Sequence, residues 1–206
     1  MKRGRRRPYV QRRRAELAEG TRARILDAVI SLHEEVGPSR TTVSAIARRA
    51  GVQRLTVYRH FPDERLLLEA CASRWISEHP PPDPTLWIEL EDPVDRTHLV
   101  LSRLFAYYRR TARMWTTTHR DAGQVPALGP AMARFEDYLR SVGDGLLDDW
   151  GDALRPEARA LVRHALRFAT WTSLAREGLD DDQMATLLVD WLVASGARAV
   201  HRSEAV

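Results

Sequence analysis

The chain has a single cysteine, no long apolar run, and modest amounts of glycine and proline. Cys71 alone cannot form an internal disulfide or a thiolate metal site, which favours a reducing compartment, so we expect a cytoplasmic protein. No stretch approaches the roughly 18 apolar residues of a membrane span. The basic start, residues 1–14, is not followed by the apolar segment of a secretory signal. Eleven glycines and eleven prolines among 206 residues exclude a fibrous or wholly disordered chain.

Charge is distributed unevenly along the 206 residues. Residues 1–60 carry 15 Lys/Arg and 5 Asp/Glu, whereas residues 61–206 carry 17 and 23. A basic N-terminal third on an acidic remainder predicts a module that binds a polyanion, attached to a body with another task. The alternative is a generic solubilising or added tail. Residues 1–19 are predicted to be a disordered arginine-rich arm, because eight Lys/Arg and no acid in residues 1–14 repel one another.

Apolar spacing predicts an all-α protein. A helix from Thr21 carries an apolar stripe that ends before Gly37-Pro38, and a short helix follows an N-cap at Thr41 or Thr42. Gly51 separates that helix from another at 53–60, and a longer one covers 64–78. No segment alternates with the two-residue period of a strand. These four helices predict a DNA-binding domain over residues 20–78, with three helices in a helix-turn-helix and a linking fourth helix.

A proline-rich connector, residues 79–84, cannot be helical and separates two modules. The second domain, residues 85–206, is predicted to contain four helices, at about 94–114, 128–150, 156–178 and 183–199, the last of which begins after the acidic residues 180–182. The length of the chain suits this division, because each part is large enough for its own core.

The helix at 53–60 has the pattern of a recognition helix. If Val57 is buried, a rotation of 100° per residue puts Leu55 and Arg59 on the opposite face, with Thr56 and Tyr58 at its flanks. Arginine pairs with guanine edges in the major groove, and leucine contacts the thymine methyl group. The start of such a helix usually reaches the bases, which favours Arg54 and Leu55.

The stretch TTVSAIARRAGVQRLTVYRHFPDERLLLEAC, residues 41–71, resembles the DNA-binding domain of TetR-family transcriptional regulators. The specific part is Gly51-Val52-x-x-x-Thr56-Val57-Tyr58-x-His60-Phe61 followed by Leu67-Leu68. The resemblance with its first helix covers about residues 20–75, and the rest of the chain resembles the family in architecture alone. One departure is Asp63-Glu64-Arg65, where the family often has Lys-Glu, so glutamate replaces a lysine that faces phosphate.

The resemblance implies roles for matched positions. Thr42, Tyr58 and His60 occupy positions of phosphate contacts, whereas Ser44, Arg54, Leu55 and Thr56 occupy positions that reach base edges or adjacent backbone. Arg59 belongs to the same face, and Phe61 packs the recognition helix on the fourth helix. In this context the arm, with Arg5, Arg6 and Arg7, is expected to lie in a minor groove. Two copies on a palindromic double-stranded operator are implied.

Large aromatic residues in the second domain predict either a core or an effector pocket. In the family this domain binds a small molecule, so the resemblance implies an effector, here hydrophobic or aromatic. The candidate lining residues are Phe105, Tyr108, Trp115, Phe135, Tyr138, His164, Phe168 and Trp171. For His164 a buried core position is the alternative to a ligand contact.

The last two predicted helices are apolar on more than one face, so both faces must be covered. The resemblance implies a four-helix interface of a homodimer, with a thick monomer core as the alternative. The candidate interface residues are Leu161, Ala165, Leu187, Leu188, Trp191, Leu192 and Ser195.

Enzyme and metal motifs are missing. His119-Arg120-Asp121 spells a kinase triplet, but Pro126 stands where asparagine is required, and the seven histidines have no metal-ligand spacing. We therefore expect neither catalysis nor a cofactor, and predict a ligand-released repressor that binds DNA on the bacterial nucleoid. An activator or effector-independent regulator with the same DNA module, and a non-specific architectural DNA binder that uses the arginine arm, remain alternatives.

Overall fold

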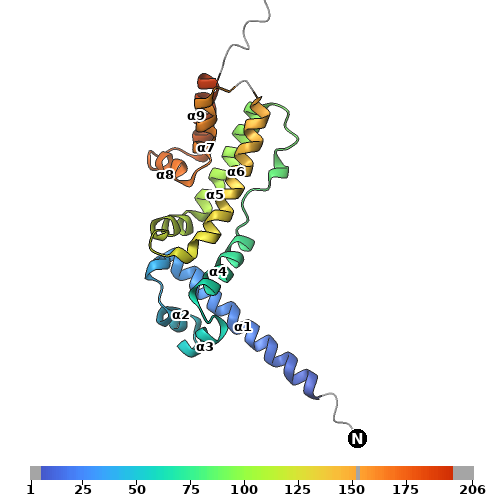
Figure 1. Ribbon diagram of the computed structural model, residues 1–206, viewed down its shortest axis with the longest axis vertical. Helices are drawn as coiled ribbons and strands as arrows, with labels where there is room; N and C mark the ends of the chain where they lie inside the picture. Colours follow the sequence, from blue (N-terminus) through green and yellow to red (C-terminus); the bar gives the residue numbers. More distant parts are fainter. Residues whose placement is uncertain (1–5, 152–153, 197–206) are drawn as a thin grey trace, which may run out of the picture. The chain divides into compact units, whose positions relative to one another are not determined.

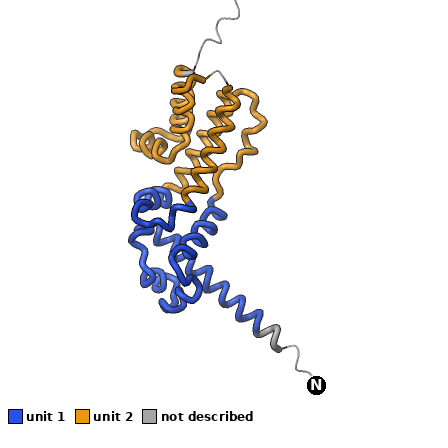
Figure 2. The backbone as a smooth tube through the Cα atoms, in the orientation of Figure 1, with its two compact units in different colours: residues 1–79, 113–131 blue, residues 80–112, 132–206 orange. Residues whose placement is uncertain are grey.

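A computed structural model describes residues 6–151 and 154–196 of the chain (Figure 1). Every regular element in these two ranges is a helix, and none of these helices is long and apolar enough to cross a membrane. The chain divides into two compact units, residues 1–79 with 113–131 and residues 80–112 with 132–206 (Figure 2). The expected all-α architecture is confirmed.

Unit 1 contains the helix-turn-helix. Its helices are α1 (Arg6–Glu35), η1 (Pro38–Arg40), α2 (Val43–Ala50), α3 (Arg54–His60), α4 (Glu64–Glu78), the end of α5 (Pro93–Asp121), η3 (Pro126–Leu128) and the first residues of α6 (Gly129–Trp150). The bounds of α3 and α4 agree with the predicted ones to within a residue.

Helix α1 begins much earlier than predicted. Residues 6–19, expected to be disordered, are helical, and residues 11–20 are exposed along that extension. Arg12 and Glu16 form an ion pair of 3.0 Å one turn apart, which favours helix locally. Repulsion between the arginines does not prevent this extension, because a helix nucleated by the packed residues after Thr21 extends without a new nucleation cost.

Capping signals in the sequence explain where α2 and α4 begin and where α2 ends. The hydroxyl of Thr42 accepts the backbone N–H of Ala45 at 3.2 Å, and the carboxylate of Asp63 accepts that of Leu66 at 2.8 Å. Gly51 has the left-handed φ of 65° that terminates α2 and turns the chain toward α3. These local features set both ends of α2 and the start of α4.

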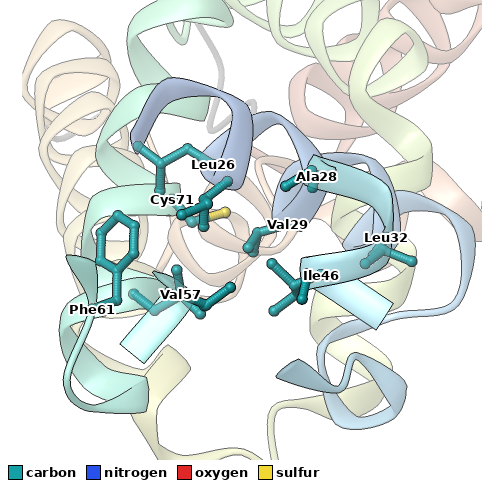
Figure 3. Close-up of a cluster of buried hydrophobic side chains, with 12 residues drawn as sticks. Leu26, Ala28, Val29, Leu32, Ile46, Val57, Phe61 and Cys71 are labelled. Carbon is teal, nitrogen blue, oxygen red and sulfur yellow. The ribbon is translucent and has the colours of Figure 1, made fainter. Parts of the chain in front are cut away.

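The core of the DNA-binding domain lies between α1 and the three helices that follow it (Figure 3). Ile25 and Val29 on α1 have no exposed surface, and Ile46 on α2 and Val57 on α3 are exposed by no more than 2%. The predicted stripe of α1 therefore is the buried face. The buried members of this core are Ile25, Leu26, Ala28, Val29, Leu32, Ile46, Ala47, Ala50, Val57, Phe61, Leu67 and Cys71.

Unit 2 is built from α5 to α9. It contains η2 (Pro84–Leu86), residues 93–112 of α5, α6 from residue 132, α7 (Pro156–Ala165), α8 (Phe168–Arg176) and α9 (Asp181–Gly196). Helix α5 continues seven residues beyond its predicted end at Met114, through three consecutive threonines. The hydroxyl of Thr117 donates to the carbonyls of Arg113 and Met114, so the middle threonine of this run, a residue type of low helix propensity, has its hydroxyl paired within the helix.

The helix predicted for residues 156–178 is in fact two helices, α7 and α8, which are separated at Leu166-Arg167. Arg167 has an extended backbone, with φ −79° and ψ 143°. The hydroxyl of Tyr108 donates to the carbonyl of Leu166 at 2.7 Å, and that of Thr170 donates to the carbonyl of His164 at 2.6 Å. These bonds satisfy two carbonyls at the break, and the first comes from a residue 58 positions away.

The core of unit 1 predicts the cost of removing a side chain between α1 and α2. Ile46→Ala is expected to lower the free energy of unfolding by about 2–5 kcal/mol, because it removes buried apolar surface and leaves a cavity. Leu55→Ala, at a side chain 75% exposed, is the control and should change it by less than about 0.5 kcal/mol. Urea denaturation followed by circular dichroism measures both variants. Equal effects would contradict the assignment of Ile46 to the core.

Candidate nucleic-acid interface

Helix α3 has one buried face and one exposed face. Val57 is 1% exposed, whereas Leu55 is 75% and Tyr58 45% exposed. Arg54 and Arg59 are also exposed, and Thr56 and His60 are half-buried at the edges. The face predicted to read the major groove is therefore the open face of the helix.

Helix α2 is attached to α1 by polar contacts as well as by its apolar side. The guanidinium of Arg49 donates to the hydroxyl of Ser31 at 2.7 Å and to the carboxylate of Glu35 at 2.8 Å. This pairing lowers the pKa of Glu35 below its usual value. Arg49 thus helps to position α2. Thr42, the N-cap of α2, and Ser44, in its first turn, are exposed.

The end of α3 is fixed by Phe61. Its ring is 4% exposed within the core, and the guanidinium of Arg22 on α1 lies 5.2 Å from the ring centre. Such a cation–π contact holds the arginine over the aromatic face. The packing role expected of Phe61 agrees with this burial.

The start of α4 carries carboxylates at the place where TetR-family domains often have a lysine that faces phosphate. Asp63 caps α4, and Asp63 and Glu64 line a groove of about 300 Å³ that Tyr58 also borders. Arg65 is exposed and pairs with Glu69 at 3.2 Å, one turn further along α4. The first turn of α4 therefore carries its positive charge at Arg65, next to the carboxylates of Asp63 and Glu64.

Arginines beyond those singled out from the sequence extend the basic surface of unit 1. Arg48 on α2 is exposed, as are Arg12, Arg13 and Arg14 on the extension of α1. The sequence signal for the last three was the basic run of residues 1–14, and for Arg48 it was the charge of residues 1–60. Among the predicted contacts, Arg5 lies outside the described residues, and the backbone of Arg6 and Arg7 belongs to α1.

Unit 2 brings several predicted effector residues into one aromatic cluster. The ring of Tyr108 lies 5.3 Å from Phe168, 6.1 Å from Trp171 and 6.2 Å from Phe135, between centroids. Tyr138 stacks on Phe135 at 5.7 Å and donates its hydroxyl to the carbonyl of Pro82. Burial raises the pKa values of Tyr108 and Tyr138, so both phenols are neutral donors at physiological pH.

Three other predicted lining residues have different surroundings. Phe105 lies in unit 2, three residues before Tyr108, and has no exposed surface. Trp115 belongs to unit 1, where its ring meets Trp75 edge to face at 5.9 Å. His164 is exposed, so the buried core position considered for it is wrong.

The predicted interface residues of α7 and α9 divide between the inside and the outside of unit 2. Ala165, Leu188 and Leu192 are buried and, with the half-buried Leu161, border a small gap of about 10 Å³ against α5 and α6. Leu187 and Trp191, by contrast, are 48% and 57% exposed, and Ser195 is half-buried. One face of α9 therefore completes the core, and the other carries exposed apolar side chains.

Sequence comparison relates the N-terminal domain to known regulators. Residues 25–71 match the family described as bacterial regulatory proteins, tetR family. An uncharacterized HTH-type transcriptional regulator of Mycobacterium tuberculosis is 43% identical over 58 residues, which are 28% of this chain and 31% of the relative. The HTH-type transcriptional regulator SrpR of Pseudomonas putida is 44% identical over 70 residues, 34% of this chain and 32% of the relative. The matched part spans about a third of these relatives.

Structural comparison extends the likeness to the fold of the whole chain. A TetR-like transcriptional regulator from Rhodococcus sp. RHA1 superposes with a TM-score of 0.59 and 20% identity, over 86% of this chain and 97% of the other. FadR from Bacillus subtilis, solved with stearoyl-CoA, gives 0.58 and 19%, over 84% and 98%. RolR, solved with resorcinol, gives 0.52 and 21%, over 90% and 92%. The helix-turn-helix at residues 25–71 is therefore that of the tetR family of bacterial regulatory proteins, and most of the chain has the fold of TetR-like transcriptional regulators.

Proposed function

We propose that the protein is a ligand-released repressor that binds a palindromic operator as a homodimer in the bacterial cytoplasm. The observation that carries the proposal is the open face of α3, where Leu55 is 75% exposed beside the exposed Arg54 and Arg59. A large apolar side chain on a basic surface has no favourable partner in water, whereas a thymine methyl group in the major groove is one.

The contacts on DNA divide by chemistry. Arg54 and Leu55, at the start of α3, reach base edges, with Thr56 and Ser44 beside them. The side chains of Thr42, Tyr58, Arg59 and His60 donate to phosphates and fix the register of the helix. For all of these residues except Arg59, this division is the one that the resemblance to TetR-family domains implies, and Arg59 is exposed next to Tyr58 on α3.

The extension of α1 supplies sequence-independent affinity. Arg12, Arg13 and Arg14 are exposed, and the first seven residues add five more basic residues, Arg5, Arg6 and Arg7 among them. Consecutive residues of a helix point about 100° apart, so a helical extension can bring some of these arginines to the phosphates of the DNA backbone. Entry of the arginines into a minor groove would instead require the start of α1 to unwind locally.

The exposed face of α9 is proposed to form the dimer interface. Leu187 and Trp191 lie one helical turn apart and remain uncovered, although Leu188 and Leu192 on the same helix are buried. A second copy related by a two-fold axis would cover this face and give the dimer the symmetry of a palindrome.

The aromatic cluster of unit 2 is proposed to be the effector site. The rings of Tyr108, Phe135, Phe168 and Trp171 pack against one another, so a hydrophobic or aromatic effector must part them. The complexes of FadR with stearoyl-CoA and of RolR with resorcinol support an apolar or aromatic ligand for this fold. To reverse 99% occupancy of the operator, the effector needs about 5.5 kcal/mol of preference for the DNA-incompetent conformation.

Selection of the protein on random duplexes tests the reading of bases by α3. The wild-type protein should enrich a palindrome, and Arg54→Ala should relax one position in each half-site and weaken binding by about 10- to 100-fold, because a bidentate arginine–guanine contact is lost. Arg140→Ala removes an exposed arginine from α6 and is the control for charge. If both variants enrich the wild-type palindrome equally, Arg54 does not read the sequence.

Deletion of residues 1–14 tests the extension. The slope of log affinity against log salt should become shallower by about 0.9 for each phosphate contact that is removed. The enriched palindrome should stay the same, because α3 is intact. An unchanged slope, measured by fluorescence anisotropy between 50 and 200 mM salt, would contradict a role for these residues on DNA.

Substitution on α9 tests the dimer. Trp191→Arg should convert the dimer to a monomer in sedimentation velocity, because a charge would replace an apolar contact at the interface. The monomer should lose affinity for the full palindrome while it keeps the helix content of the wild-type protein. Ser141→Arg, at an exposed position on α6, is the control and should leave the dimer intact. A wild-type protein that sediments as a monomer would rule out the proposed interface.

A further inference from the structure

The last turn of α5 contacts the turn that leads into the helix-turn-helix. Asp121, the final residue of α5, is 1% exposed, and its carboxylate accepts the backbone N–H of Ser39 in η1 at 2.9 Å. Ser39 is in the first turn of η1, where an N–H has no partner within the helix. A side chain 82 residues away thus supplies the acceptor that the local sequence lacks.

Arg120 completes the contact from the neighbouring position. Its guanidinium pairs with the carboxylate of Asp121 at 2.7 Å and donates to the carbonyl of Val36 at 2.8 Å. Val36 follows the end of α1, so the two side chains hold both ends of the segment that joins α1 to η1. We call Arg120 and Asp121 together the α5 clamp.

Gly37 makes room for the α5 clamp. Its φ is 93°, in the left-handed region, and a Cβ at this position would lie 2.0 Å from the nearest guanidinium nitrogen of Arg120 and 2.4 Å from Asp121 Oδ2. Any other residue would collide with both side chains. The close approach of backbone to clamp therefore depends on the absence of a side chain.

The clamped segment determines where α2 begins. The hydroxyl of Thr41 donates to the carbonyl of Gly37 at 2.9 Å, and the next residue, Thr42, caps α2. Each residue of η1 takes part in a backbone or side-chain hydrogen bond, and these bonds hold the conformation of the chain from Gly37 to the N-cap. A shift of Ser39 would move the start of α2, and with it the position of α3.

The carboxylate of Asp121 is ionised at physiological pH. The hydrogen bonds from Arg120 and Ser39 lower its pKa to about 2. Burial lowers the pKa of His33 on α1 to about 4, although the charge of Asp121 acts in the opposite direction. The imidazole is therefore neutral at pH 7. The cation that balances Asp121 is therefore Arg120.

We propose that Asp121 and Arg120 are positioning residues for sequence-specific DNA binding, which hold the α1–α2 turn so that α2 and α3 meet the operator in register. The inference rests on the proposed function as a DNA-binding regulator. It concerns the last turn of α5, which lies outside the helix-turn-helix and outside the family match at residues 25–71.

The variant Asp121→Asn separates positioning from charge. Loss of a carboxylate makes the protein more basic, so charge alone would strengthen binding to any duplex. Loss of the clamp instead weakens operator binding by about 10- to 100-fold, the range expected when a hydrogen bond to a charged group is lost. Affinity for a scrambled duplex of equal length should stay the same or rise.

The control is Asp27→Asn, a matched change in the same unit. Asp27 on α1 is exposed and pairs with Arg74 at 2.7 Å, so this variant also removes one carboxylate and one arginine pairing. Its ratio of operator to scrambled affinity should equal that of the wild-type protein. Arg120→Lys keeps the net charge but replaces the guanidinium, which uses two different nitrogens for Asp121 and Val36, with one ammonium nitrogen, and it should lower the ratio too.

Amide hydrogen exchange without DNA provides a second readout. In Asp121→Asn the amides of Ser39 and of the first turn of α2 should exchange faster, whereas those of α4 should keep wild-type protection. An unchanged affinity ratio in both clamp variants, or unchanged exchange at Ser39, would overturn the inference. If the wild-type protein selects no sequence, the proposed function fails, and the exchange at Ser39 still decides whether the clamp holds the turn.

Discussion

The buried face of α1 is the contact on which the DNA-binding domain depends. Ile25 and Val29 have no exposed surface and belong to one buried cluster with side chains of α2, α3 and α4 (Figure 3). Because the three following helices are short, none of them buries enough apolar surface to be stable without α1. The way α2 and α3 pack on this face of α1 sets the orientation of α3. Every proposed contact of α3 with DNA depends on that orientation.

Polar bonds then select one arrangement among those that an apolar face allows. Arg49 links α2 to Glu35, Thr42 and Asp63 cap α2 and α4, and Asp121 binds the turn before α2. Apolar contacts are not directional, whereas hydrogen bonds are, so the first supply stability and the second supply register. Accurate register is what reading of base edges requires.

Buried titratable groups in unit 1 are held in neutral forms, in contrast to Asp121. Burial lowers the pKa of His33 to about 4 and raises that of Cys71 to about 12, and the two side chains lie 3.9 Å apart. At neutral pH the imidazole and the thiol are both uncharged, which suits an apolar core. Among the described residues of unit 1, Asp121 is the one fully buried group that is ionised, and it has its own arginine and a backbone donor.

The sequence by itself determined the elements that rest on neighbouring residues. The stripe of α1, the caps at Thr42 and Asp63, the left-handed Gly51 and the exposed face of α3 all follow from periodicity and local bonds, so they could be predicted. Only the tertiary structure decided the break between α7 and α8, which the hydroxyl of Tyr108 stabilises, the division of α9 into a buried and an exposed face, and the contact of Asp121 with Ser39. These features depend on partners 58 or 82 residues away, and no local pattern encodes which distant side chain meets a given carbonyl or amide.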